Sequence, residues 1–324
     1  MTVTSAAASA PLVRDRLDVW RRRAVVANLV AQVLIIVTGG LVRLTASGLG
    51  CSSWPSCEPG HFTPTVHDAT SYHPFIEFGN RTITGVLVVV SLAVALLVGL
   101  DRRRSASYRT MAWVPLVGVV VQAVVGGMAV LYQLPPAVVS SHMLLSMVLV
   151  AVSTWLVVRS RESDAVPTPV VDAVTRRLVA GLGVAAVAVV ALGVVVTGAG
   201  PHSGDDRVGY RFAVDPFQMA RVHSLAVWIF VALLVAVLLR LRRTGPTAAR
   251  RAAWLLLAVT AAQALIGYVQ LFTGLPIALV DLHMLGAAAL VVAVVLLAGT
   301  LRTRGPVPAL PAPGPQPAAA ARAA

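Results

Sequence analysis

Long apolar runs, rather than amphipathic stripes, dominate the chain. A helix that spans a bilayer needs about 20 mainly apolar residues. Eight segments meet this requirement, at about 24–42, 77–100, 111–131, 139–158, 178–198, 217–239, 253–272 and 280–300. Backbone polar groups in lipid must be satisfied within the segment, which helices do. The pattern therefore predicts an all-α integral membrane protein with eight transmembrane helices.

The charged residues orient this arrangement. Of the 324 residues, 57% are hydrophobic and only 12% are charged, and the net charge is +13. All 26 basic residues are arginines, and 21 of them lie at the N-terminus, in alternate connections and in the C-terminal tail. The positive-inside rule places these segments, and so both termini, in the cytoplasm. We expect a multi-pass plasma-membrane protein that does not bind nucleic acid, because the arginines flank apolar runs.

A repeat divides the chain into two halves. The run RTMAWVPLVGVVVQAVVGGMAVLYQLPPAVVSSHML aligns without a gap with RRAAWLLLAVTAAQALIGYVQLFTGLPIALVDLHML. The matched pairs lie 141 positions apart: Trp113 and Trp254, Gln122 and Gln263, Gly126 and Gly267, Pro135 and Pro276, His142 and His283. We therefore predict two tandem, pseudo-symmetric four-helix bundles. The repeat is parallel, which disfavours an alternating-access transporter built on an inverted repeat.

The repeat also predicts the domain organisation. The expected parts are a cytoplasmic N-terminal segment 1–23, a first unit 24–160 with an outer loop 44–74, a cytoplasmic linker 161–177, a second unit 178–302 and a cytoplasmic tail 303–324. The tail is rich in proline and alanine, a composition typical of disorder.

Three histidines fall within predicted membrane helices, each near the outer end: His142, His223 and His283. Ionisable residues at such positions usually face the bundle interior and mark function. His223 and His283 lie at similar depth on two helices that run in the same direction. Two such imidazoles can bind a heme iron from both faces, whereas zinc needs further ligands that the sequence does not supply nearby. A buried histidine bonded to a neighbouring helix is the alternative, and for this matched pair we favour heme.

The first unit carries an incomplete version of the same arrangement. His142 is the repeat mate of His283, but the position that matches His223 falls at residues 79–81, where no histidine stands. Asn80, a neutral amide, is a poor iron ligand. The second unit is thus suited to electron transfer, and the first, with an open coordination position, to chemistry on a substrate.

Charged residues accompany Asn80 at the start of the second helix. Glu77 lies three residues before Asn80 and shares its helix face. A carboxylate in a partly dry cavity can act as a general acid or base, although an ion pair with Arg81, four residues on, is a structural alternative. Arg43, near the outer end of the first helix, is a further cation that could meet a heme propionate or Glu77.

The two cysteines, Cys51 and Cys57, lie in GLGCSSWPSCEPG on the outer loop. A disulfide persists outside the cytoplasm, and with two cysteines only one pairing can form. Its role, as a loop staple or in redox chemistry, stays open.

These motifs together resemble the heme A synthase family. The runs GGLVRLTASGLGCSSWPSC, IEFGNR, SSHML, VHSL and DLHML carry the resemblance, which covers roughly residues 24–300. Members have eight helices in two four-helix halves and oxidise the C8 methyl of heme O stepwise to the formyl group of heme A. The resemblance implies an auxiliary heme b on His223 and His283, a heme O site with His142 and an essential Glu77, and a Cys51–Cys57 disulfide.

One position departs from the family pattern. The second helix often carries E-x-x-H in the family, whereas this chain has Glu77 followed by Asn80. We therefore expect His142 alone to hold the substrate iron, with Asn80 hydrogen-bonding a water or the heme rim and with Arg81 and Arg43 as further cofactor-binding residues. The competing function is a di-heme b-type electron-transfer protein without heme modification. Expected partners are heme O, the lipid bilayer, a heme O synthase and a quinol electron donor, and a homo-oligomer is an open option.

Overall fold

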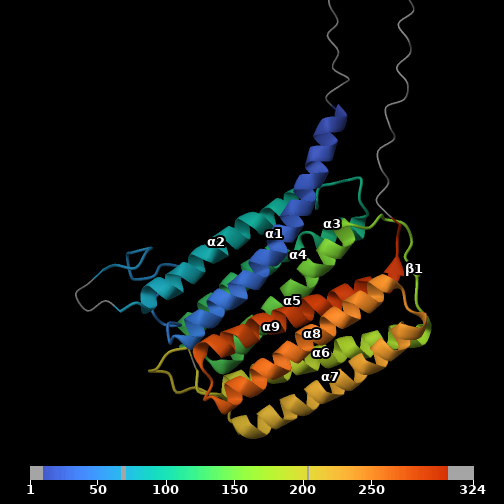
Figure 1. The fold of residues 1–324 in the computed structure, drawn as a ribbon. Coiled ribbons are helices and arrows are strands. Elements are labelled where there is room, and N and C mark those ends of the chain that lie inside the picture. The colour runs from blue at the N-terminus through green and yellow to red at the C-terminus, as the bar shows by residue number, and fades with distance from the viewer. Residues whose placement is uncertain (1–9, 67–70, 203, 306–324) are drawn as a thin grey trace, which may run out of the picture.

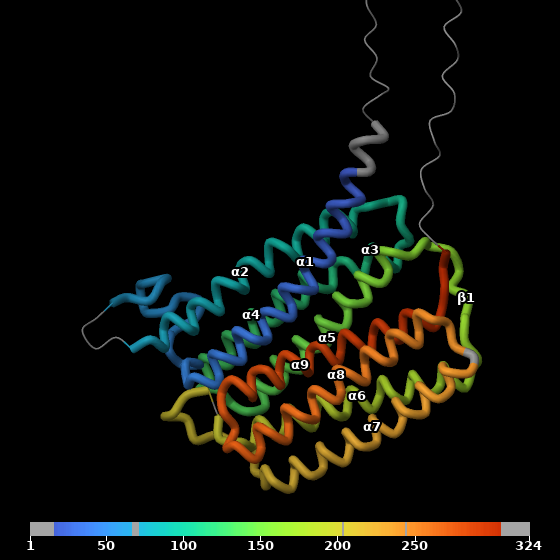
Figure 2. The backbone as a smooth tube through the Cα atoms, in the orientation of Figure 1, coloured from blue at the N-terminus to red at the C-terminus, as the bar shows by residue number. Residues whose placement is uncertain are grey.

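The computed structural model describes residues 10–66, 71–202 and 204–305, which form a bundle of long helices tilted in a common direction (Figures 1 and 2). The helices are α1 Ala10–Leu44, α2 His73–Leu97, α3 Ala106–Met111, α4 Val114–Leu131, α5 Pro136–Ser160, α6 Ala173–Ala199, α7 Pro216–Thr244, α8 Thr247–Phe272 and α9 Ile277–Gly299. Counting α3 and α4 as one segment, the described part has eight helical segments long and apolar enough to cross a membrane. The predicted helical multi-pass architecture is confirmed, while the pseudo-symmetry of the halves and the side on which the termini lie stay predictions.

Several helix boundaries differ from the sequence prediction, and two of the differences have a local cause. α1 begins at Ala10, within the segment expected to precede the first helix, because alanine, leucine and arginine favour helix. Its early turns are held by Asp18, which pairs with Arg21 and Arg103 at 2.6 Å each. The third membrane segment is interrupted between α3 and α4, and Pro115 in the first turn of α4 accounts for the break, because proline has no N–H to donate to the carbonyl of Met111, four residues earlier.

The linker and the start of the tail form a small sheet. β1 (Thr168–Pro169) pairs antiparallel with β2 (Arg302–Thr303), so the chain is not purely helical. The tail was expected to be disordered from residue 303, but Thr303 lies in β2 and the described chain continues to residue 305. The rest of the predicted tail, 306–324, lies outside the described residues, as do residues 1–9 of the N-terminal segment.

The two halves pack on each other through α1, α5 and α9. α1 contacts α2, α5 and α9, and α5 also contacts α4 and α6. Ile36, Met147, Val150 and Ala288 form a buried apolar cluster from these three helices. Each half also has its own buried core, and the one in the second half includes the fully buried Phe230. The interface between the halves is therefore part of the continuous interior of the bundle.

A polar network joins the linker to both halves at the end of the bundle where α5 finishes. Asp164 accepts hydrogen bonds from Arg104 at 2.8 Å, Arg159 at 2.6 Å and the Ser105 amide at 2.9 Å. Arg302 reaches Glu162 in the same network at 3.2 Å. Burial would raise the pKa of Asp164, but hydrogen bonds from Arg104 and Ser105 and the Arg104 charge hold it well below its ordinary value of 3.8. Asp164 is thus ionised in the folded protein.

We expect Asp164→Asn to lower the free energy of unfolding by about 1–3 kcal/mol, because it removes a charge that satisfies two guanidinium groups. Since folding lowers the pKa, this contribution is present above 3.8 and disappears as the pH falls through the lower folded value. Thermal unfolding in detergent at neutral pH measures the effect. Asp206→Asn, at an exposed position, is the control, and equal midpoints for the two variants would contradict the prediction.

Candidate functional site

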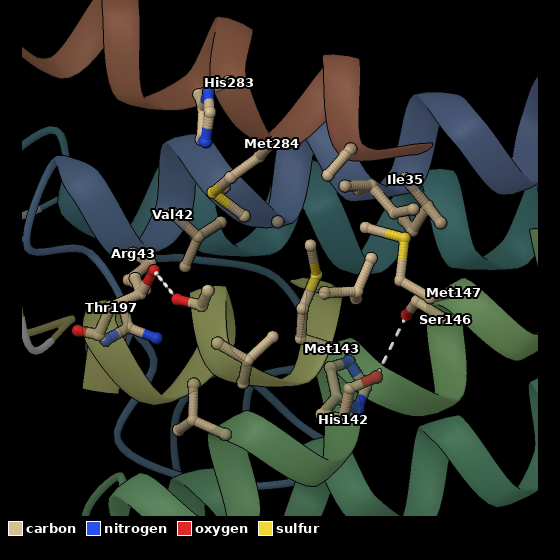
Figure 3. Close-up of a pocket in the computed structure, with 18 of the residues that line it drawn as sticks. Ile35, Val42, Arg43, His142, Met143, Ser146, Met147, Thr197, His283 and Met284 are labelled. Carbon is tan, nitrogen blue, oxygen red and sulfur yellow. Dashed lines mark hydrogen bonds between the residues drawn. The ribbon is translucent and has the colours of Figure 1, made fainter. Parts of the chain in front are cut away.

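One cavity of about 680 Å³ lies between the two halves and collects every predicted iron-ligand position. Its lining includes Arg43, Glu77, Asn80, Arg81, His142, His223 and His283. Figure 3 shows His142 and His283 on opposite sides of the view, with Met143, Met147 and Met284 between them. The polar residues that the sequence singled out, which come from five different helices, therefore surround one largely apolar space.

Each of the three helix histidines lies against a glycine of a neighbouring helix. A Cβ built on the glycine would stand close to the imidazole Cε1: 3.5 Å for Gly126 and His142, 3.2 Å for Gly193 and His223, and 3.3 Å for Gly267 and His283. Glycine allows this close approach of ring and backbone. We call these three glycines the histidine seats. The sequence repeat revealed two of them, Gly126 and Gly267, but gave no reason for their recurrence.

In the second half, His223 and His283 fit the ligand set of a heme. The imidazole Nδ1 of His223 lies 3.1 Å from the Val189 carbonyl oxygen, so this nitrogen is the donor and Nε2 is left as the ligating atom. His283 lines the same cavity as His223. Its Nδ1 is buried without a hydrogen-bond partner. The two histidines are thus suited to bind one heme iron, and within the described residues only the His223 ring is oriented by a hydrogen bond.

In the first half, a glutamine supports the helix turn that carries His142. Gln122 Nε2 donates to the His142 carbonyl oxygen at 3.0 Å and to Ser146 Oγ at 2.5 Å. The His142 Nδ1 is buried without a partner. Sequence reasoning noted Gln122 as a repeated residue but assigned it no contact. Gln122, on α4, thus holds the backbone of α5 at His142, the predicted iron ligand.

Asn80 is committed to a neighbour through its oxygen. Thr38 Oγ1 donates to Asn80 Oδ1 at 2.7 Å, so the amide atom best suited to a metal is already engaged. Asn80 lines the cavity, and its Nδ2 donates no hydrogen bond within the described residues. The amide therefore presents a hydrogen-bond donor, rather than an iron ligand, in the first half.

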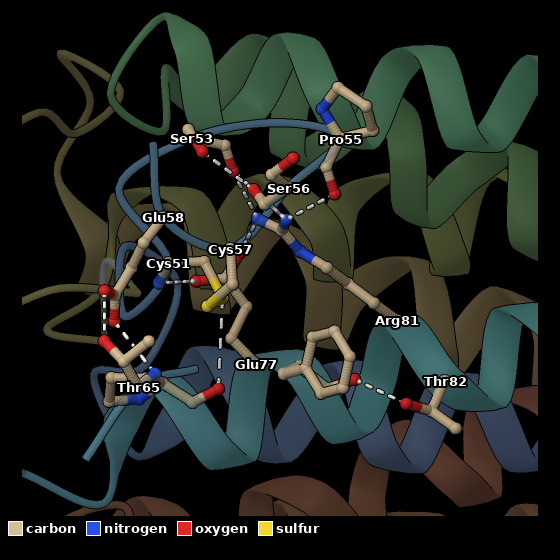
Figure 4. The surroundings of a disulfide bond; sticks show 12 residues. Cys51, Ser53, Pro55, Ser56, Cys57, Glu58, Thr65, Glu77, Arg81 and Thr82 are labelled. Carbon is tan, nitrogen blue, oxygen red and sulfur yellow. Dashed lines mark hydrogen bonds and ion pairs between the residues drawn. A yellow bond between two sulfur atoms is a disulfide. The ribbon is translucent and has the colours of Figure 1, made fainter. Parts of the chain in front are cut away.

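Glu77 and Arg81 hold the loop that carries the disulfide (Figure 4). Cys51 and Cys57 are bonded to each other, and we call residues 51–57 the disulfide loop. The Cys51 amide donates to Glu77 Oε2 at 2.7 Å, and Arg81 pairs with Glu77 Oε1 at 2.5 Å. Arg81 also donates to loop carbonyl oxygens of Ser53 and Ser56, each at 3.1 Å. The ion pair expected as the structural alternative for Glu77 is thus present, and the carboxylate also anchors the disulfide loop.

The disulfide loop closes part of the cavity. Trp54 and Pro55 of the loop belong to the cavity lining. The Trp54 ring packs so closely on α4 that a Cβ on Gly127 would lie 2.7 Å from its Cδ2 atom. The loop therefore reaches from α2 to α4 as a roof at this end of the bundle, which we call the disulfide end. No sequence pattern had indicated this contact.

Arg43 does not pair with Glu77 among the described residues. Its Nε donates to the His202 carbonyl oxygen at 2.9 Å and its Nη2 to the Thr197 carbonyl oxygen at 2.8 Å. Both acceptors belong to the second half, so Arg43 bridges the halves at the disulfide end.

Comparison with known proteins agrees with these features. The family model described as cytochrome oxidase assembly protein matches residues 22–202, which include Glu77, Asn80 and His142 but not His223 or His283. A curated heme A synthase of an Exiguobacterium species is 28% identical over 135 residues, which are 41% of this chain and 43% of the relative. Those of Bacillus pumilus and Symbiobacterium thermophilum are 30% and 32% identical, and each alignment covers 36% of this chain and 37% of the relative.

The match thus spans less than half the length of the curated relatives, whereas the family model covers more than half of this chain. On that match, the chain belongs to the cytochrome oxidase assembly protein family, whose curated relatives here are heme A synthases.

Proposed function

We propose that the protein is a heme A synthase that oxidises the C8 methyl of heme O stepwise to the formyl group of heme A, for cytochrome oxidase assembly. The observation that carries the proposal is the asymmetry of one shared cavity. Three histidines line it on glycine seats, and an amide already bonded to Thr38 stands where a fourth ligand would complete the symmetry. An open coordination position suits a substrate heme, and a complete pair suits an electron-transfer heme.

The residues take separate roles under this proposal. His223 and His283 hold an auxiliary heme b, which supplies electron transfer when bound. His142 holds the iron of heme O from one face, and Gln122 fixes the turn that presents His142. Glu77 is the acid at the wall of the substrate site and, through Cys51, also holds the disulfide loop over it. The apolar lining, with Met143 and Met284, keeps water away from both groups.

The second candidate is a di-heme b-type quinol oxidoreductase that moves electrons without altering heme. A pure electron carrier would be served by two complete ligand pairs, whereas Asn80 leaves the first half incomplete. A heme O synthase as supplier of the substrate and a quinol as electron donor are proposed partners.

Heme analysis separates the two candidates. The chain is expressed in cells that make heme O but not heme A, and extracted hemes are analysed by HPLC with mass spectrometry. We expect hydroxylated and formyl heme. A folded, heme-loaded protein that yields heme O and heme b alone would exclude the synthase and leave the electron carrier.

Asn80→His tests the open coordination position. A histidine here would supply the missing second ligand, so we expect the ferric heme at the His142 site to change from a high-spin to a low-spin bis-imidazole EPR signal. Asn80→Leu, which removes the amide without adding a ligand, should leave the heme high-spin. A low-spin bis-imidazole signal from this site in the unaltered protein would show that another residue already binds the iron.

A further inference from the structure

Two arginines lie near the disulfide end of the bundle, and within the described residues both donate hydrogen bonds only to neutral acceptors. Arg43 comes from the last turn of α1, and Arg211 from the connection between α6 and α7. Arg211 donates to carbonyl oxygens of Gly200 and Pro201 at 2.7 Å, Tyr210 at 2.8 Å and Val208 at 3.2 Å. Arg43 donates to the carbonyl oxygens of Thr197 and His202. All these acceptors are uncharged backbone groups.

The two guanidinium groups are held on the same short segment, residues 197–202, because Arg43 binds the carbonyl oxygens at its two ends and Arg211 binds those of Gly200 and Pro201 between them. Among the described residues, neither forms an ion pair with a carboxylate, whereas Arg207 of the same connection pairs with Asp205 at 2.9 Å. Partly buried like charges held together without a counterion are unfavourable. Carbonyl oxygens orient the two side chains but leave their charge uncompensated. The arrangement therefore has the form of an anion site, since paired guanidinium groups bind carboxylates strongly.

The position of this pair identifies the anion. Arg43 lines the cavity and binds Thr197, one turn beyond Gly193, the seat of His223. His223 lies seven residues into α7, about 10 Å along the helix from Pro216 at the disulfide end. A ligand that fits has an apolar body and a metal at the depth of the histidines, and carboxylates at the mouth of the cavity. A heme, with both propionates on one edge, has this chemistry.

We propose that Arg43 and Arg211 together receive the propionate carboxylates of the heme held by His223 and His283, with that edge of the heme at the disulfide end. The inference rests on the proposed heme site and adds Arg211 and the orientation of the auxiliary heme. The first half contributes Arg43 to the binding of a heme whose iron ligands are both in the second half. This contact couples the two halves through the cofactor.

Heme binding by full-length protein tests the pair. His142→Ala removes the first-half ligand, and this protein, produced under heme limitation, is titrated in detergent with heme b or with heme b dimethyl ester. The ester keeps the iron and the ring but carries no propionate charge. We expect heme b to bind tighter than its ester. Arg211→Gln in the same background should weaken heme b by about tenfold or more, the effect of losing one charge-assisted hydrogen bond, and leave the ester unchanged.

Matched variants guard against a folding effect. Arg207→Gln, at an exposed arginine already paired with Asp205, should preserve the preference for heme b. Arg211→Lys should restore part of it, because the charge returns without the planar fork. Equal affinities for heme b and its ester in the His142→Ala protein, or an equal loss of both in Arg211→Gln, would overturn the proposal. Because no heme oxidation is measured, an inactive enzyme that still prefers heme b would count against the proposed reaction and not against this site.

Discussion

His283→Ala is expected to strip the proposed auxiliary heme from the protein while the proposed heme O site keeps its ligand. His283 and His223 both line the cavity, and each ring lies on its own glycine seat. A heme held by His223 alone loses one of two iron bonds and the low-spin state that both impose. We therefore expect near-complete loss of the low-spin absorbance and EPR signal assigned to this site, measured on protein purified in detergent.

The control for His283→Ala is His61→Ala, which alters an exposed histidine of the loop between α1 and α2. This control should retain the full low-spin signal. His223→Ala should reproduce the loss, because the two ligands belong to one iron. An unchanged low-spin signal in His283→Ala would rule out a heme bound by His223 and His283 in the second half.

Glu77→Ala is expected to lower the yield of oxidised heme by at least about a hundredfold, the effect of losing a general acid or base, and to leave the auxiliary heme bound. The Glu77 carboxylate is buried in the cavity wall between Arg81 and the Cys51 amide. Product is measured by HPLC of extracted hemes, and the auxiliary heme by its absorbance in the same sample. Near-normal product from Glu77→Ala would reduce Glu77 to a structural residue.

Arg81→Gln separates chemistry from loop anchoring. This change breaks the bonds from Arg81 to Glu77 and to the disulfide loop but keeps the carboxyl group. If Glu77 acts on substrate, Arg81→Gln should retain clearly more product than Glu77→Ala. Equal losses in the two variants would mean that Glu77 serves the reaction by holding the disulfide loop.

The sequence was enough to predict the membrane helices and to single out the histidines, Glu77 and Asn80, which line the cavity. Membrane helices are specified by the length and apolarity of each segment, which are local properties. The histidines and Glu77 stood out because an ionisable residue within a membrane helix is energetically unfavourable and usually has a functional role. The repeat then related His142 to His283 and exposed Asn80 as the departure. The start of α1 was missed because its first turns are charged, and hydropathy does not detect a helix that extends beyond the apolar run.

The contacts that complete the site could not be predicted in the same way. The partners of Arg43 lie more than 150 positions away and are backbone carbonyls, which leave no mark in the side-chain pattern. The packing of Trp54 on Gly127 depends on the path of a long loop. The strand pairing of Thr168 with Thr303 likewise joins a linker to a tail, each too short to be read as a strand. These contacts join segments that are far apart in the sequence, so they depend on how the helices pack and not on the pattern of any one segment.

The shared cavity has a consequence for the biogenesis of the protein. Its walls come from both halves, and His283 lies in α9, the last of the described membrane helices. Domains generally form in order from the N-terminus during synthesis, so the first half can insert and fold before α9 exists. The proposed auxiliary heme can be bound by both histidines only after α9 has been translated. Cofactor loading is then a late step in maturation, and a chain truncated before α9 would reach the membrane without a complete site.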